Sequence, residues 1–78
     1  MAEDFEARLA GCFARAFMGF PVEGIPRASM ATTPGWDSSA TLTLISLIEQ
    51  EFDCWLGFER AAEMVSFAAV ADIVRAKV

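Results

Sequence analysis

Apolar residues recur every three or four positions over the first twenty residues of the chain. Four of them follow one another at intervals of four: Phe5, Leu9, Phe13 and Phe17. A helix places residues at this spacing on one side, and Glu6, Arg8 and Arg15 then fall on the other faces. The pattern therefore predicts an amphipathic helix from about Glu3 to Phe20, with its phenylalanine stripe in the core.

The segment from Pro21 to Asp37 shows neither helical nor strand periodicity. It contains all three prolines and two of the five glycines, the residues that most often interrupt regular structure. Gly19 and Pro21 are expected to end the preceding helix. A loop of this length in a small domain needs anchors on the core. Three apolar residues are the expected anchors: Val22, Ile25 and Met30.

A second amphipathic pattern starts abruptly after the turn signal Pro34-Gly35. Asp37 offers a carboxylate as N-cap, and Ser38 takes the first position of the predicted helix. A wide apolar surface follows up to Phe52: Leu42, Leu44, Ile45, Leu47, Ile48 and Phe52. Glu49 and Glu51 near the far end oppose the helix dipole, which favours a role for them outside the fold.

Gly57 interrupts the helical pattern again. A short helix is predicted from Glu59 to Met64, and Ser66 then caps a final helix. The stripe of that last helix is expected in the core: Phe67, Val70, Ile73, Val74 and Val78. No strand pattern or internal repeat is present. The sequence thus predicts one all-α domain over residues 1–78, with three longer helices, one short helix and a long first loop.

Composition narrows the classes of function. The net charge is −5, from 11 acidic and 6 basic residues, and a chain this acidic is repelled by nucleic-acid phosphates. We therefore expect basic protein partners and no nucleic acid. The chain has no histidine, which removes the commonest general base, Ser–His nucleophile activation and histidine metal ligands. We predict no catalytic residue, no metal site and no enzymatic activity.

The remaining composition indicates where the protein works. Cys12 and Cys54 lie among apolar residues and are expected to be reduced, as in cytoplasmic proteins. No stretch approaches the roughly 20 apolar residues of a membrane span. The N-terminus carries Glu3 and Asp4 where a signal peptide has basic residues. The prediction is a cytoplasmic protein without a membrane span.

The unusual local feature is the run from Pro34 to Ser39, just before the second helix. A serine in the first turn presents its hydroxyl to solvent at the end of a long loop. A phosphate attached there meets unpaired backbone N–H groups and the positive end of the helix dipole. Ser38 is therefore well placed to hold a phosphodiester, although Asp-Ser before an apolar helix is most often an ordinary cap.

This region resembles the acyl carrier protein family, whose attachment motif is Asp-Ser-Leu leading into a helix that ends in acid-acid-Phe. The residues that carry the resemblance follow Gly35-Trp36-Asp37-Ser38: Leu42, Leu44, Ile45, Ile48, Glu49, Glu51, Phe52 and Asp53. The similarity continues without gaps through Leu56, Met64 and Phe67 to Val74. Upstream it includes the first helix, so that it covers essentially the whole chain.

The resemblance implies a four-helix bundle that carries a covalent 4′-phosphopantetheine arm on Ser38. A phosphopantetheinyl transferase would attach the arm from coenzyme A, with Asp37 helping to position magnesium during transfer. The thiol of the arm would hold an acyl or aminoacyl group as a thioester. The implied partners are that transferase, a loading ligase for the acyl or aminoacyl group, and a downstream synthase or transferase. The implied docking residues lie along the second helix: Ser39, Leu42, Ser46, Glu49 and Glu51.

The chain departs from the family at several of these positions. Ser39 stands where the family nearly always has leucine, and Ser46 replaces an apolar partner contact, so Leu42 alone keeps the docking face apolar. Ala40 and Thr43 stand where many relatives carry acids. A carrier for a specialised lipid, polyketide or peptide pathway is therefore favoured over a general fatty-acid carrier. Attachment at Ser39 instead of Ser38 stays open.

Two other classes of function remain as alternatives. One is an unprimed, carrier-like helical module for protein interaction, which Ser39 and the loss of acids at Ala40 and Thr43 favour. The other is a small helical DNA-binding or regulatory domain, which the acidic charge disfavours. Trp55 and Phe58 belong to the core, to the mouth of an acyl cavity or to a homodimer contact, and the sequence does not choose among these three.

Overall fold

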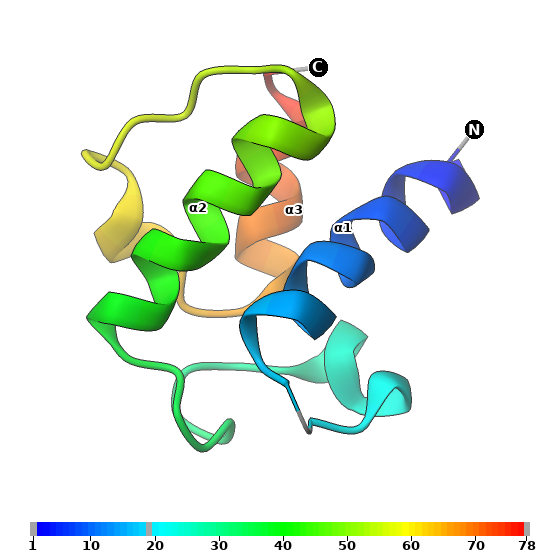
Figure 1. The fold of residues 1–78 in the computed structure, drawn as a ribbon, viewed down its shortest axis with the longest axis vertical. Helices are drawn as coiled ribbons and strands as arrows, with labels where there is room; N and C mark the ends of the chain where they lie inside the picture. The colour runs from blue at the N-terminus through cyan, green and yellow to red at the C-terminus, as the bar shows by residue number, and fades with distance from the viewer. Residues whose placement is uncertain (1, 19, 78) are drawn as a thin grey trace.

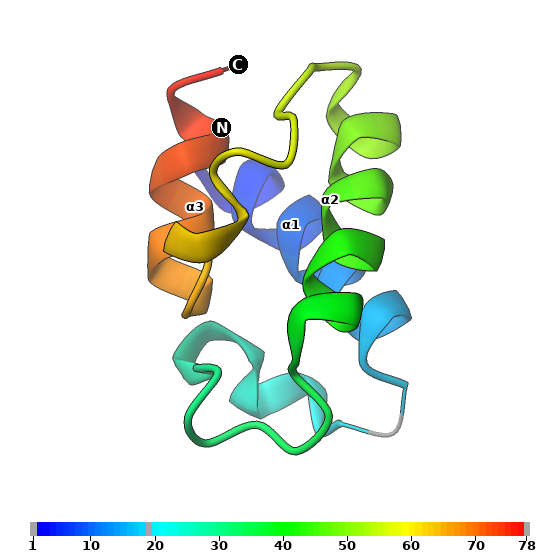
Figure 2. The ribbon, with the colours of Figure 1, turned by 90° about the vertical axis from the view of Figure 1, so that its left-hand side faces the viewer.

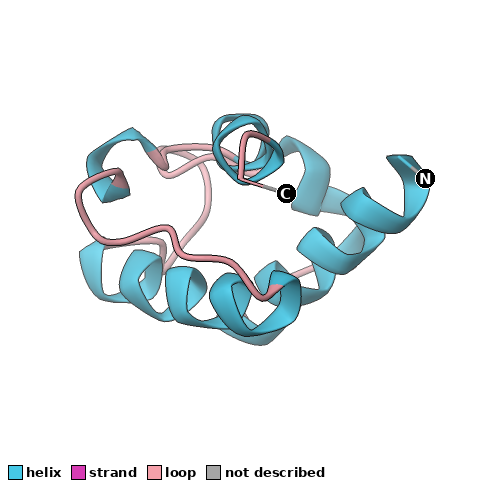
Figure 3. Ribbon diagram, turned by 90° about the horizontal axis from the view of Figure 1, so that it is seen from above, coloured by secondary structure: helices cyan, strands magenta, loops and turns pink. Residues whose placement is uncertain are grey.

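The computed structural model describes residues 2–18 and 20–77. They form three α-helices and two short 3-10 helices, arranged as shown in Figure 1: α1 (Ala2–Ala16), η1 (Val22–Arg27), α2 (Ser38–Phe52), η2 (Ala61–Glu63) and α3 (Phe67–Arg75). No strand occurs among them, as Figure 3 shows by its secondary-structure colours. The prediction of an all-α fold is confirmed. None of the described helices combines the length and the apolar character needed to cross a membrane.

Helix α1 buries the predicted phenylalanine stripe. Leu9, Cys12 and Phe13 are almost fully buried, and Phe5 packs against the core from its edge. The helix ends at Ala16 rather than at Phe20. Pro21 accounts for the absence of Phe20 from the helix, because the residue before a proline avoids the α conformation. The prediction that Gly19 ends the helix lies outside the described residues, as do the predictions for Val78 and for the side chain of Val22.

The segment between α1 and α2 is more regular than the sequence predicted. Figures 1 and 2 show it passing beneath the lower ends of the helices. Residues Val22–Arg27 form the 3-10 helix η1, with Pro26 inside it, and this corrects the prediction of an irregular loop. Ile25 is almost completely buried and Met30 is half-buried, in line with their predicted role as anchors. The Met30 N–H also donates to the Val65 carbonyl at 2.7 Å, which ties the segment to the residues before α3.

Helices α2 and α3 begin at the predicted caps. The Asp37 and Ser66 side chains accept hydrogen bonds from the Ala40 and Ala69 N–H groups, respectively. Helix α2 ends at Phe52, and its C-cap Asp53 has a left-handed φ of 50°, a conformation that aspartate adopts more readily than most residues. Between the two helices, the predicted short helix Glu59–Met64 reduces to the single 3-10 turn η2.

Aromatic side chains organise the core around Phe13. Its ring lies 5.0 Å from that of Phe67 on α3, 5.5 Å from that of Trp36 and 6.0 Å from that of Phe17. One side chain of α1 thus joins α3 and the segment that leads into α2. The core therefore fixes where α2 begins, and with it the position of Ser38.

Candidate functional site

The start of α2 presents Ser38 to solvent. Asp37 has extended backbone angles, and its Oδ1 accepts the Ala40 N–H at 2.9 Å, which makes Asp37 the N-cap. Ser38 is the first helical residue and is exposed. The predicted presentation of the Ser38 hydroxyl is therefore found in the structure. A group attached to Ser38 would lie at the positive end of a helix of 15 residues.

A buried hydrogen-bond relay holds this helix start in place. The Trp36 indole Nε1 donates to Thr41 Oγ1 at 2.9 Å, and the Thr41 hydroxyl donates to the Asp37 carbonyl at 3.0 Å. Trp36 and Thr41 are 4% and 2% exposed, so water cannot substitute for these bonds without local opening. The relay thereby fixes Trp36, Asp37 and Thr41, while the exposed Ser38 side chain makes no hydrogen bond among the described residues.

An uncharged hollow of about 360 Å³ lies beside Ser38. Its lining comes from α2, from the segment around η2 and from the first loop: Met30, Ser38, Thr41, Leu42, Phe58, Ala61 and Ala62. Leu42 is four residues after Ser38 and so lies on the same face of α2. The hollow combines apolar side chains with the hydroxyl residues Ser38 and Thr41, and its lining includes Ser38 but not Ser39.

The other predicted docking serines are also exposed. Ser39 follows Ser38 on the next face of the first turn, and Ser46 lies two turns along α2 from Ser38. Leu42 is 42% exposed between them. Ser38, Leu42 and Ser46 therefore form one continuous exposed row along α2, with spacings of four residues.

Glu49 has a structural role that the sequence did not predict. Its Oε2 accepts hydrogen bonds from the Leu56 N–H at 3.0 Å and from the Gly57 N–H at 3.2 Å. The carboxylate thus caps the turn that follows α2, where two backbone donors lack partners of their own. A partner that docks on Glu49 would have to compete with these two bonds.

Replacing Glu49 by alanine is therefore expected to lower the free energy of unfolding by about 1–2 kcal/mol, because two backbone donors lose a charged acceptor. Denaturant unfolding measures this loss, and amide exchange at Leu56 and Gly57 should speed up. Glu23→Ala, which removes an exposed acid from η1, is the control and should change stability by less than about 0.5 kcal/mol. Equal stability of the Glu49 and Glu23 variants would contradict the capping role.

Glu51 is likewise engaged within the fold. Its Oε2 lies 2.8 Å from Arg8 Nε, and Arg8 Nη2 donates to the Glu51 carbonyl at 2.6 Å. The Arg8 guanidinium also stacks on the Phe52 ring, 4.6 Å from its centroid. These contacts join α1 to the end of α2. The docking roles of Glu49 and Glu51 remain predictions, and the geometry gives both carboxylates internal partners.

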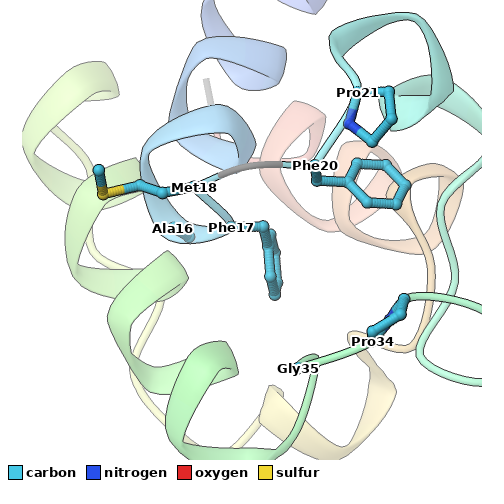
Figure 4. Close-up of a pocket in the computed structure, with 7 residues that line it drawn as sticks. All are labelled: Ala16, Phe17, Met18, Phe20, Pro21, Pro34 and Gly35. Atoms are coloured by element: carbon cyan, nitrogen blue, oxygen red, sulfur yellow. The ribbon is translucent and has the colours of Figure 1, made fainter.

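A larger hollow of about 580 Å³ lies under the end of α1, as shown in Figure 4. Its lining is apolar apart from the backbone: Ala16, Phe17, Met18, Phe20, Pro21, Pro34 and Gly35. In Figure 4 the Phe17 ring points from the end of α1 toward Gly35, while Met18 extends to the left, away from Phe20 and Pro21. No lining side chain is ionisable or nucleophilic. The seven residues that line the larger hollow therefore provide an apolar surface without a reactive group, whereas the smaller hollow contains Ser38.

The two cysteines are unreactive in character. Burial, and secondarily the charge of Glu51, raises the pKa of the Cys12 thiol to about 11. Burial, followed by the charge of Glu49, also raises the pKa of Cys54. Both remain protonated near neutral pH, and the thiolate is the nucleophile. Residues 2–18 and 20–77 contain no group of three or more acidic or cysteine side chains suited to a metal ion.

The sequence did not predict the structural roles of Thr41 and Trp36, whose side chains are hydrogen-bonded to each other. Thr41 is a polar residue on the buried side of α2, at a position where the helical period calls for an apolar one. That mismatch is a usable signal, because a buried hydroxyl must find a hydrogen-bond partner. Its partner Trp36 lies five residues earlier, within reach once the N-cap is placed at Asp37.

Comparison of the chain with protein-family models, with curated proteins and with solved structures gives no match.

Proposed function

We propose that the protein is a carrier that bears a 4′-phosphopantetheine arm on Ser38 and belongs to a specialised lipid, polyketide or peptide pathway in the cytoplasm. The observation that carries the proposal is the exposed Ser38 hydroxyl at the capped start of α2, beside an uncharged hollow. The resemblance to acyl carrier proteins supplies the identity of the arm. In that reading the three α-helices and η2 correspond to a carrier-type four-helix bundle.

The residues around Ser38 fit such an arm. The first-turn N–H groups and the helix dipole favour a phosphodiester at this position. The hollow formed with Leu42 and Phe58 gives an uncharged surface against which a pantetheine chain or a short acyl group packs. When attached, the arm supplies a thiol for thioester chemistry, and the protein residues position it. The ionisable side chain next to Ser38 is Asp37, which caps α2, and the chemistry is assigned in this proposal to visiting enzymes.

Asp37 would serve two purposes. Oδ1 caps α2, and Oδ2, which makes no hydrogen bond among the described residues, is the oxygen proposed to assist magnesium in the transfer complex. The row of Ser38, Leu42 and Ser46 is the proposed docking edge for the transferase, the loading ligase and the downstream enzyme. Ser39 borders this edge at the helix start.

Incubation with coenzyme A, magnesium and a broad-specificity phosphopantetheinyl transferase tests the proposal. Intact-protein mass spectrometry should show the addition of one phosphopantetheine group to the wild-type chain. Ser38→Ala should show none, whereas Ser39→Ala should still be modified because Ser39 does not line the hollow. Both substitutions affect exposed residues at the helix start, so both variants should fold. Modification of Ser38→Ala, or no modification of the wild type, would refute the proposal.

The second candidate is an unprimed interaction module with the same fold. It is favoured by the exposure of Trp55 and Phe58, which are 73% and 61% exposed, since large solvent-facing aromatics mark binding surfaces. This candidate predicts that Ser38 stays unmodified in the transferase reaction while a protein partner still binds.

A further inference from the structure

Two large aromatic side chains project from the segment between α2 and η2. Trp55 is 73% exposed and Phe58 is 61% exposed. The backbone that carries them is held in place, because Leu56 is buried and Glu49 accepts the Leu56 and Gly57 N–H groups. Aromatic surface displayed on an ordered backbone needs little reorganisation on binding, which favours a role in recognition.

The Trp55 indole and the Glu59 carboxylate converge over Gly57. Gly57 has a φ of +75°, and a Cβ atom at this residue would lie 2.9 Å from Glu59 Oε1 and 3.6 Å from Trp55 Nε1. The missing side chain therefore leaves room for the Trp55 indole and the Glu59 carboxylate next to the same backbone position. Both side chains approach Gly57, which is buried together with Leu56, whereas Trp55, Phe58 and Glu59 are exposed.

Elsewhere in the chain, two other pairs of an aromatic ring and a carboxylate each bind an arginine side chain. Arg8 lies over the Phe52 ring at 4.6 Å and pairs with the adjacent Glu51. Arg75 lies over the Phe5 ring at 4.6 Å, with its Nη2 3.8 Å from the adjacent Glu6. In each case the arginine comes from another helix and meets a ring and a carboxylate together.

Trp55 and Glu59 form a third pair of an aromatic ring and a carboxylate. No arginine among the described residues binds this pair. Among the described residues Glu59 and Asp53 make no ion pair, and the nearby Arg60 is bound to Glu63 through both Nε and Nη2. A planar guanidinium matches such a pair, because it stacks on an indole and donates in-plane hydrogen bonds to a carboxylate.

We propose that Trp55 and Glu59 form a docking site for an arginine side chain of a basic partner protein. The net charge of −5 attracts a basic protein and opposes a second copy of this acidic chain. Phe58 extends the site with apolar surface toward the Ser38 hollow, whose lining it shares. The site goes beyond the proposed carrier function, because it does not need a modified Ser38.

Nuclear magnetic resonance titration of the Ser38→Ala chain tests the site, since that variant cannot be primed there. The probe is a synthetic amphipathic peptide with a row of arginines beside leucines, and the comparison peptide has glutamine in place of each arginine. The Trp55 indole N–H and the Gly57 amide should shift with the arginine peptide. Binding should weaken about fivefold or more in Trp55→Ala and in Glu59→Gln. Trp55→Phe, which keeps a ring, should lose less.

Met18→Ala is the matched control, because Met18 is 88% exposed but lies beside the larger hollow under α1. It should bind the arginine peptide as the parent chain does. Slow amide exchange at Leu56 and Gly57 in the free variants would show that their hydrogen bonds to Glu49, and with them the turn, remain in place. Failure of the arginine peptide to bind, equal binding of the glutamine peptide, or equal affinity of Trp55→Ala and its parent would overturn the proposal. A dimer that Trp55→Ala dissociates would also overturn it, because a second copy would then be the occupant.

Discussion

Replacing Phe13 by alanine is expected to lower the free energy of unfolding by about 3–5 kcal/mol. Phe13 is 1% exposed and contacts the rings of Phe17, Trp36 and Phe67, so its removal leaves a cavity where three segments meet. A domain of this size has a total stability of about 5–15 kcal/mol. Thermal and denaturant unfolding should therefore show midpoints well below those of the wild type.

Phe58→Ala is the matched control for this prediction, since it makes the same substitution at a residue that is 61% exposed. It should change stability by less than about 0.5 kcal/mol. Similar unfolding midpoints for Phe13→Ala and Phe58→Ala would show that Phe13 is not the centre of the core.

Replacing Trp36 by alanine is expected to cost a similar amount, about 3–5 kcal/mol, and to disturb the start of α2. The indole packs on Phe13 and Phe17 and donates to Thr41, so its loss removes both the packing and the hydrogen bond that fix the residues around Ser38. Chemical denaturation measures the stability loss. At a temperature where the variant is folded, the rate of phosphopantetheine transfer to Ser38 should also fall.

Two variants separate the contributions of Trp36. Trp36→Phe keeps most of the packing but loses the donor to Thr41, and it should cost about 1–2 kcal/mol and speed amide exchange at Ala40 and Thr41. Trp55→Ala removes an exposed tryptophan and should leave stability nearly unchanged. An α2 start as well protected in Trp36→Phe as in the wild type would show that the indole hydrogen bond does not hold the site.

Local sequence patterns predicted the features that depend on neighbouring residues. The helical period gave the buried faces of α1, α2 and α3, and side-chain caps gave the start of α2 at Ser38 and of α3 after Ser66. Capping is a contact over three residues, so it can be read from the chain directly. The exposure of Ser38 was likewise predicted from its position in the first turn after the Asp37 cap.

Features that depend on contacts between residues far apart in the chain could not be predicted from the sequence. Glu51 pairs with Arg8, 43 positions away, and Glu49 reaches over the end of α2 to two amides of the next turn. Both acids were predicted to face a partner because their position opposes the helix dipole. Their tertiary contacts offset that unfavourable placement, and their docking roles remain predictions. Helix η1 was missed because six residues around Pro26 are too few to display a helical period.

The location of the modification tests the central claim most directly. Trypsin cleaves after Arg27 and Arg60 and releases residues 28–60 as one peptide, which contains both Ser38 and Ser39. After reaction with coenzyme A and a phosphopantetheinyl transferase, fragmentation of this peptide in the mass spectrometer should place the added group on Ser38. A peptide that stays unmodified, or that carries the group on Ser39, would contradict the claim that the exposed hydroxyl at the start of α2 is the attachment point.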